Sequence, residues 1–238
     1  MITPKELELF QHCPAKWQLA KTNQVSLGEP PNDYVRALKR IIYRMYAWKM
    51  SNNKPMPKES VRNYWDKNWK TESADEHEVA RNLDQAAKGW LVLEKFWWEF
   101  YTERNYTPIG VNYEFSHDFN GLHIRVHSDL TLVDEDDNIV FVEICEPKTE
   151  WEIFTSLATK AEVLAFTEKI DKPTTKIFLE LNKDSNEIKV KEFKVTTDYI
   201  GKAEASLIPV AVATRHGGIY ASPSSDCKDC PFRGQCWV

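Results

Sequence analysis

Residues 122–145, LHIRVHSDLTLVDEDDNIVFVEIC, contain the pattern that decides the expected fold. The first half alternates apolar and polar side chains, as a strand with one buried face does. The last seven residues are almost continuously apolar, which is typical of a central buried strand. The acidic segment 134–138 between them predicts a hairpin turn. The stretch therefore predicts two neighbouring strands, with Asp129 on the first and Glu143 near the end of the second.

The patterns on either side place this stretch inside a single α/β domain. Helices are predicted over residues 4–22, 33–50, 75–101, 151–170 and 197–215, and strands over residues 110–117, 122–133, 139–145, 176–181 and 187–195. This order indicates a mixed α/β core with a helical arm inserted near its front. A length of 238 residues, of which 42% are hydrophobic, suits one such domain.

The charge balance gives no global electrostatic case for nucleic acid, because the formal net charge is -5. Any DNA site must therefore be a local basic surface. Lys39, Arg40, Arg44 and Lys49 give one helix such a face, although a solvated charged face is the ordinary interpretation. No apolar run approaches the ~20 residues that span a membrane. The first residues also lack the apolar stretch of an export signal, so a cytoplasmic protein without a membrane partner is expected.

Four of the five cysteines form a candidate metal site. Cys227, Cys230 and Cys236 have C-x2-C-x5-C spacing, and thiolates around a tight turn reach one soft metal together. Cys13, in the first helix, is the natural fourth ligand. Structural zinc and an iron–sulfur cluster suit four cysteines equally, and either would join the two ends of the chain. Cys145 lies in an apolar strand and is expected to be a buried thiol.

Asp129 and Glu143 form a candidate site for a divalent cation. Adjacent paired strands bring two such carboxylates to the same end of a sheet, where they can hold one or two Mg²⁺ or Mn²⁺ ions for phosphodiester hydrolysis. Two solvated strand ends are the simpler interpretation, since the chain has 36 acidic residues. Glu143 has apolar neighbours, however, and a buried acid requires a metal or a basic partner.

The sequence at both ends resembles one nuclease family. Residues 7–14, LELFQHCP, resemble that family's first cluster cysteine with its following proline, and residues 230–232, CPF, resemble its closing motif. Residues 217–223, GGIYASP, resemble the segment that leads into this motif. Together they resemble the RecB-like branch of the PD-(D/E)XK nuclease superfamily. This branch carries a four-cysteine Fe–S cluster and includes CRISPR-adaptation exonucleases and AddB-type helicase-nucleases.

The resemblance extends over nearly the whole chain and implies its architecture. It implies an α/β restriction-endonuclease-like core, a mixed central sheet flanked by helices, with a helical insert and a C-terminal Fe–S knuckle. Residues 1–238 would form one RecB-like domain. Its parts would be a helical arm at about 33–105, a catalytic-type core at 106–216, and an Fe–S clasp of residues 1–22 with 217–238. The cofactor implied at the cysteines is a [4Fe–4S] cluster, with Zn²⁺ as the alternative.

The resemblance also assigns catalytic positions. Asp129 matches the family's first metal acid, Glu143 matches the second, and Glu114 matches an acid often found on the preceding strand. The implied ligands of Mg²⁺ or Mn²⁺ are Asp129, Glu143 and Ile144. His127 is a further candidate for contact with the metal or a scissile phosphate, because it shares the strand face of Asp129, and an ordinary cross-strand partner is the alternative interpretation.

The sequence departs from the family pattern at several of its catalytic positions. Cys145 stands where the family has its lysine, and a thiol supplies neither the charge nor the three donors of an ammonium group. Lys148 or Lys160 would have to replace it. The remaining departures are an arginine for a histidine in the early helix and two changes in a Gln-x-x-x-Tyr pattern, at Arg40, Glu162 and Phe166.

The function implied is a metal-dependent DNA nuclease, an exonuclease for single-stranded DNA in recombination, repair or CRISPR-type processing. The host would be a bacterial, archaeal or phage-infected cell. The departures favour a different class as the alternative: a catalytically inactive relative that binds DNA or docks on a recombination or CRISPR-adaptation protein. A zinc-stabilised interaction module without nucleic acid is a third interpretation.

Overall fold

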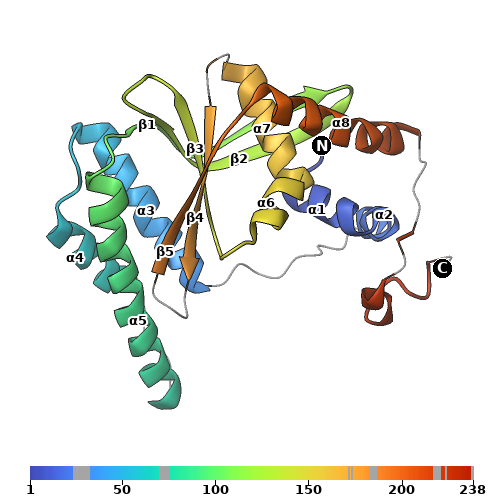
Figure 1. The fold of residues 1–238 in the computed structure, drawn as a ribbon. Coiled ribbons are helices and arrows are strands. Elements are labelled where there is room, and N and C mark those ends of the chain that lie inside the picture. The colour runs from blue at the N-terminus through green and yellow to red at the C-terminus, as the bar shows by residue number, and fades with distance from the viewer. Residues whose placement is uncertain are drawn as a thin grey trace.

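The computed structural model describes residues 1–23, 33–69, 76–170, 172, 174–182, 187–216, 221–222 and 224–236. A five-stranded mixed sheet in the order β1-β2-β3-β4-β5 forms its centre (Figure 1). The strands are β1 (Thr107–Phe119), β2 (Leu122–Val133), β3 (Ile139–Cys145), β4 (Thr174–Asn182) and β5 (Glu187–Lys194). Only the β3–β4 pairing is parallel; the other three are antiparallel. A parallel pair needs a crossover connection, which helices provide here.

One helical layer consists of the arm inserted before the sheet. It contains α3 (Asp33–Asn52), α4 (Lys58–Asn68), α5 (Glu76–Phe96) and the π-helix Trp97–Thr102. Its core joins apolar residues of these helices, including the fully buried Trp65, to Leu130, Val142 and Leu179 on one face of the sheet. Burying each such side chain contributes about 1.5–3 kcal/mol, so the arm is an integral part of the fold.

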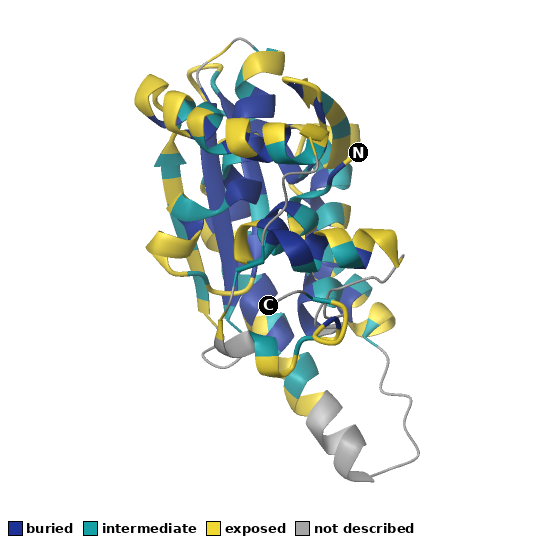
Figure 2. Cartoon of the chain, turned by 90° about the vertical axis from the view of Figure 1, so that its right-hand side faces the viewer, coloured by how far each residue is buried: buried dark blue, intermediate teal, exposed yellow. Residues whose placement is uncertain are grey.

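The second helical layer covers the other face of the sheet. It contains α1 (Pro4–His12), α2 (Pro14–Thr22), α6 (Glu150–Thr155), α7 (Leu157–Ile170) and α8 (Thr197–His216). The middle of this layer is α7, where Phe166 stacks on Phe141 of β3 with ring centroids 4.5 Å apart. Figure 2 shows the central strands buried between the layers, whereas the outer surfaces of the helices and the edge strand β5 are exposed or half-buried. The α/β class and the helix–strand order predicted from the sequence are confirmed.

β1 and β2 change face in mid-strand, and this change positions the candidate acids. Asn112 of β1 has a φ of 51°, in the left-handed region. On one side of this point Val111 and Leu130 pack against the arm, whereas on the other side Phe115 and Val126 pack against the second layer. The β2–β3 pairing stops at Leu130. Asp129 therefore lies where the two strands separate.

Three predicted helices differ from those observed. The helix expected over residues 151–170 is divided at Ser156 into α6 and α7. The single helix expected over residues 4–22 is wrong, because Cys13 is extended, at φ -158° and ψ 102°, and separates α1 from α2. Pro14 explains the break, since proline disfavours a helical residue before it and opens helices well at the first position. The helix expected to reach residue 101 ends as α5 at Phe96 and continues as the π-helix.

The tail residues Ser225–Lys228 form a 3-10 turn, η2, and the chain beyond it returns to the N-terminal helices. Asn23 Nδ2 donates to Gln235 Oε1 at 3.2 Å, which joins the end of α2 to the tail. Of the segment that resembles the family's lead-in, residues 217–220 and 223 lie outside the described residues. Among the described helices, none combines the length and apolar character that crossing a bilayer demands.

Candidate active site and cysteine cavity

Asp129 is buried at the point where β2 and β3 separate, and its carboxylate is fully hydrogen-bonded. Oδ2 accepts from the backbone N–H of Ile144 at 2.5 Å and from Lys39 Nζ at 3.0 Å. Oδ1 accepts from Lys39 Nζ at 3.2 Å and from the hydroxyl of Tyr43. Burial and the neighbouring Asp129 charge raise the pKa of Tyr43, so its hydroxyl remains a donor. The Ile144 N–H places Asp129 beside the backbone that carries Glu143.

Glu143 of β3 lies between two ammonium groups. Its Oε1 accepts from Lys148 Nζ at 2.8 Å, and its Oε2 is 3.2 Å from Lys176 Nζ. Burial alone would raise the pKa of Glu143, but Lys176 and Lys148 outweigh burial and lower it to about 2. Glu143 is therefore ionised at neutral pH.

Lys176 on β4 is completely buried and links Glu143 to Glu162 of α7, whose Oε2 is 2.7 Å from Lys176 Nζ. Burial disfavours the charged lysine, yet Glu162 and Glu143 raise the pKa of Lys176 above its ordinary value. Glu162 shares this one ammonium group with a second carboxylate. Burial, only partly offset by Lys176, raises the pKa of Glu162 to about 7.

Lys148 is fixed by its backbone as well as by its side chain. Its N–H donates to Glu180 Oε1 at 2.9 Å, and Lys191 donates both to the same carboxylate and to the Lys148 carbonyl. The ammonium group lines an open cavity of about 870 Å³ together with Glu8 of α1 and Trp151 of α6. Glu143 therefore has one lysine partner sealed in the core and one that solvent can reach.

The other residues that the sequence suggested lie at different distances from this pair. His127 is half-buried, its Nε2 is 3.9 Å from Asp129 Oδ1, and burial, partly offset by Asp129, lowers its pKa. Glu114 lies opposite His127 in the β1–β2 pairing and is exposed. Lys160 donates to Ser206 Oγ of α8 at 2.9 Å, and no contact with Asp129 or Glu143 is found among the described residues.

Cys145 does not contribute to the ionic cluster. It is buried with Ile153 and Phe178 in a small apolar cluster, as predicted. Burial, helped by the charge on Glu143, raises the pKa of this thiol to about 12. The two ammonium groups that contact Glu143 belong to Lys148 and to Lys176 of the neighbouring parallel strand.

Three residues of the site were not identified from the sequence. Lys176, Lys39 and Tyr43 contact the two acids, whereas Arg40, the residue aligned with the family histidine, makes no contact with Asp129 among the described residues. A signal for Lys176 was present: a lysine inside an apolar strand needs a carboxylate partner, and Glu143 and Glu162 stand in apolar runs of their own. Lys39 had no such signal, because it reads as part of an exposed basic face.

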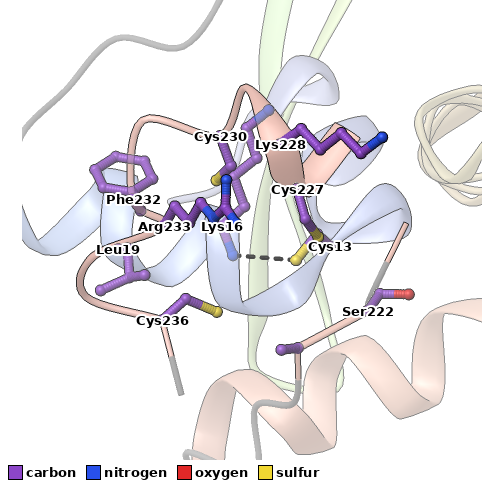
Figure 3. Close-up of a pocket in the computed structure, with 11 residues that line it drawn as sticks. Cys13, Lys16, Leu19, Ser222, Cys227, Lys228, Cys230, Phe232, Arg233 and Cys236 are labelled. Carbon is purple, nitrogen blue, oxygen red and sulfur yellow. Dashed lines mark hydrogen bonds between the residues drawn. The ribbon is translucent and has the colours of Figure 1, made fainter. Parts of the chain in front are cut away.

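Cys13 and the three tail cysteines line one cavity of about 180 Å³. Figure 3 shows Cys13, at the junction of α1 and α2, beside Cys227, with Cys230 and Cys236 on the tail loop around the same space. Leu19 and the buried Phe232 supply an apolar wall. The resemblance found in the sequence implied this meeting of the two chain ends.

Two of these sulfur atoms accept backbone hydrogen bonds. The N–H of Lys16 points to Cys13 Sγ at 3.4 Å, and the N–H of Ser224 points to Cys227 Sγ at 3.3 Å. Such bonds favour thiolates and are a recognised influence on iron–sulfur centres. Within the described parts of the chain, no group of three or more His, Cys, Asp or Glu side chains is arranged to hold a metal ion. Four thiols are the donors that a soft metal prefers, so the chemistry of the cavity fits such a metal. The sulfur atoms surround the cavity, however, without converging on one point.

The chemistry at the acidic pair fits a hard divalent cation. Asp129 and Glu143 offer carboxylate oxygens, which Mg²⁺ and Mn²⁺ prefer. A group of three side chains is not required, because Mg²⁺ is usually held by one or two carboxylates with water and substrate phosphate. Lys39 and Lys148 would have to yield part of their contacts, and both side chains are about 29% exposed and so able to move.

A mixed sheet between two helical layers, with acids on neighbouring strands and a lysine beside them, defines a nuclease-like α/β protein. The family model for the PD-(D/E)XK nuclease superfamily matches residues 1–237. The chain belongs to that superfamily. The resemblance stated from the sequence is confirmed at this level.

Comparison with solved structures supports the same fold. The crystal structure of a candidate exonuclease from Eubacterium rectale aligns over 99% of this chain and 88% of its own, at 8% identity and a TM-score of 0.54. The crystal structure of SSO0001 aligns over 93% of both chains, at 13% identity and a TM-score of 0.36, which is too low to indicate a shared fold. No curated protein matches the sequence.

Proposed function

We propose that this chain is a Mg²⁺- or Mn²⁺-dependent DNA nuclease, acting as an exonuclease on single-stranded DNA. The observation that carries the proposal is the hydrogen bond from the Ile144 N–H to Asp129 Oδ2 at 2.5 Å. It sets the Asp129 carboxylate against the backbone of the residue next to Glu143, where two neighbouring strands separate. Membership of the nuclease superfamily supports the same activity.

Asp129 and Glu143 would hold the divalent cation, which supplies an activated water and charge stabilisation for the leaving oxygen. Lys148 is the candidate for contact with the scissile phosphate, because it faces an open cavity. Lys176 is sealed in the core, so its role would be to keep Glu143 ionised. Tyr43 and the Ile144 N–H would fix the orientation of the Asp129 carboxylate.

Degradation of end-labelled single-stranded DNA in the presence of Mn²⁺ tests the proposal. We expect mononucleotide products from the wild type and a loss of at least 100-fold in rate for Asp129→Ala and for Glu143→Ala, about the size of a lost catalytic electrostatic contact. Asp198→Ala is the matched control, since Asp198 is an exposed acid of α8 paired with Lys202. Cleavage that survives both acid substitutions would refute the assignment.

A specific observation favours a second function, a catalytically silent relative that binds DNA. Asp129 is paired with Lys39, and Glu143 is paired with Lys148 and Lys176, so both candidate metal ligands already have cationic partners without a divalent ion. Sequence-independent binding of single-stranded DNA, without cleavage by the wild type in Mn²⁺ or Mg²⁺, would select this function over the first.

We also propose that Cys13, Cys227, Cys230 and Cys236 hold one metal centre, a [4Fe–4S] cluster with Zn²⁺ as the alternative. The shared cavity and the N–H bonds to two sulfur atoms support this. Anaerobic purification should give a brown protein with broad visible absorption, and Cys13→Ser should lose most of its iron. Cys145→Ser is the control that should keep it. A colourless protein containing one equivalent of zinc would select the alternative.

A further inference from the structure

A second cavity lies next to Asp129, between the helical arm and β1. Its volume is about 500 Å³, within the range of small-ligand sites. Two of its lining residues also reach the acidic site: Tyr43 donates to Asp129, and Asn112 Oδ1 is 2.9 Å from His127 Nε2. The cavity and Asp129 therefore share a wall one side chain thick.

The cavity is positively charged in a chain whose net charge is negative. Arg40 and Arg44, one turn apart on α3, both line it and are exposed. Arg40 makes no hydrogen bond or ion pair with any described residue. Arg44 lies over the ring of Tyr64, 5.6 Å from its centroid. No Asp or Glu is among the residues that line this cavity in the described part of the chain. Two guanidinium groups without a carboxylate are suited to phosphate oxygens.

The remaining wall is aromatic. Tyr64 and Trp69 are partly exposed and line the cavity, and Trp69 is supported from behind by the buried Trp65, with ring centroids 4.9 Å apart. Aromatic rings of this kind accept a nucleobase by stacking, without preference for sequence. Cations and aromatic faces together match the two chemical parts of a nucleotide, its phosphate and its base.

We propose that this cavity receives an unpaired nucleotide of single-stranded DNA. The base packs against Tyr64 and Trp69, the phosphate lies at Arg40 and Arg44, and the strand continues past Tyr43 to Asp129. The inference rests on the proposed function for its substrate, but it concerns recognition and not hydrolysis. A base-paired nucleotide does not fit, because its stacking face is covered within the duplex.

Fluorescence anisotropy with a labelled oligothymidylate, in EDTA to prevent cleavage, tests the proposal. The double variant Arg40→Ala with Arg44→Ala should weaken binding at least 10-fold. The slope of the logarithm of the binding constant against the logarithm of the salt concentration should become shallower by about 1.4, the value for two lost phosphate contacts on a single strand. Tyr64→Leu should weaken binding by roughly 10-fold with the salt dependence unchanged, as loss of one stacked base does. Arg62→Ala is the matched control, an exposed arginine of α4 paired with Asp66 and outside the cavity.

Several outcomes would overturn the inference. Wild-type affinity in the double arginine variant, or equal competition by a duplex of the same length, excludes an unpaired nucleotide at this site. Tighter binding of oligouridylate than of oligothymidylate would assign the cavity to RNA, and thymidine monophosphate competing as strongly as the oligomer would assign it to a free nucleotide. The nuclease proposal and the cavity proposal can fail separately. If the cavity variants bind single-stranded DNA more weakly but the wild type shows no Mn²⁺-dependent cleavage, only the nuclease proposal is refuted. Cleavage that requires Asp129 but ignores Arg40 and Arg44 refutes only the cavity.

Discussion

Replacing Lys176 with methionine should destabilise the protein severely, because Lys176 holds two buried carboxylates together. Its ammonium group lies 2.7 Å from Glu162 Oε2 and 3.2 Å from Glu143 Oε2, and the residue is wholly inaccessible to solvent. Methionine preserves the bulk of the side chain, so the substitution removes charge and leaves little cavity. Glu143 keeps Lys148 as a partner, whereas Glu162 keeps no ion pair among the described residues.

The expected magnitude follows from breaking one buried ion pair, about 3–5 kcal/mol. A domain of this kind is stable by roughly 5–15 kcal/mol, so the loss is a large part of the total. For 150–250 residues each kcal/mol lowers the melting temperature by about 2–4 °C, which predicts a fall of roughly 6–20 °C. At low pH Glu162 is protonated, and a neutral buried carboxyl needs no cationic partner. Lys176→Met should therefore lower the free energy of unfolding less near about pH 5 than near about pH 8.

Urea denaturation followed by circular dichroism measures the effect, with Lys202→Met as the control. Lys202 is an exposed lysine paired with Asp198 on α8, and its loss should cost less than about 0.5 kcal/mol. In the double variant Lys176→Met with Glu162→Gln, at least half of the lost stability should return, since the unpaired carboxylate is gone. A Lys176→Met variant no less stable than the control, or strictly additive losses in the double variant, would refute the reasoning.

Three further predictions concern other parts of the molecule. Because the pKa of Glu162 is raised to about 7, the free energy of unfolding should fall as pH rises from about 4.5 through 7, by about 3 kcal/mol at most. Urea titrations at a series of pH values should show this fall in the wild type and not in Glu162→Gln. A Cβ on Gly89 would lie 2.5 Å from the ring of the buried Trp65, so Gly89→Ala should cost about 1–3 kcal/mol in the same urea titrations. Gly201 has open space around it, so Gly201→Ala should gain about 0.5–1 kcal/mol. Burial raises the pKa of the Cys145 thiol to about 12, so Cys145→Ser should leave the thiol titre of the native protein unchanged and lower that of the unfolded protein by one.

The arrangement of strands was predictable because hydrophobic periodicity records burial directly. Residues 122–133 and 139–145 are the observed limits of β2 and β3. The approach of Asp129 to the segment of Glu143 was expected from adjacent strands, but Asp129 lies just beyond the last strand pair and reaches that segment through the Ile144 N–H. The sequence did not predict the face change at Asn112, since a single left-handed residue leaves no periodic signal.

The lysine partners were harder to predict, because they depend on contacts between distant segments. Lys176 reaches Glu143 only because β3 and β4 pair in parallel, with Phe141 opposite Lys176, after a crossover through α6 and α7. Nothing local specifies that register. Lys39 reaches Asp129 only because α3 packs over the edge where β1 and β2 change face. Long-range packing decided which cations meet which acids, whereas the local sequence decided only that each buried acid needed one.

The cysteine cavity and the acidic site are mechanically connected through α1. Just before its start, Ile2 pairs with the sheet, where Ile2 N donates to His123 O at 2.7 Å, and the helix ends at His12 with Cys13 as its C-cap. Between these ends, the side chain of Gln11 bonds Thr155 O and the N–H of Leu157, which fixes α1 against the segment that follows Lys148. A metal centre at Cys13 would therefore hold the C-terminal end of α1. Loss of the metal should loosen α1, which forms one wall of the cavity that Lys148 lines. Asp129 should be disturbed less, because Lys39 and Tyr43 hold it from the opposite helical layer.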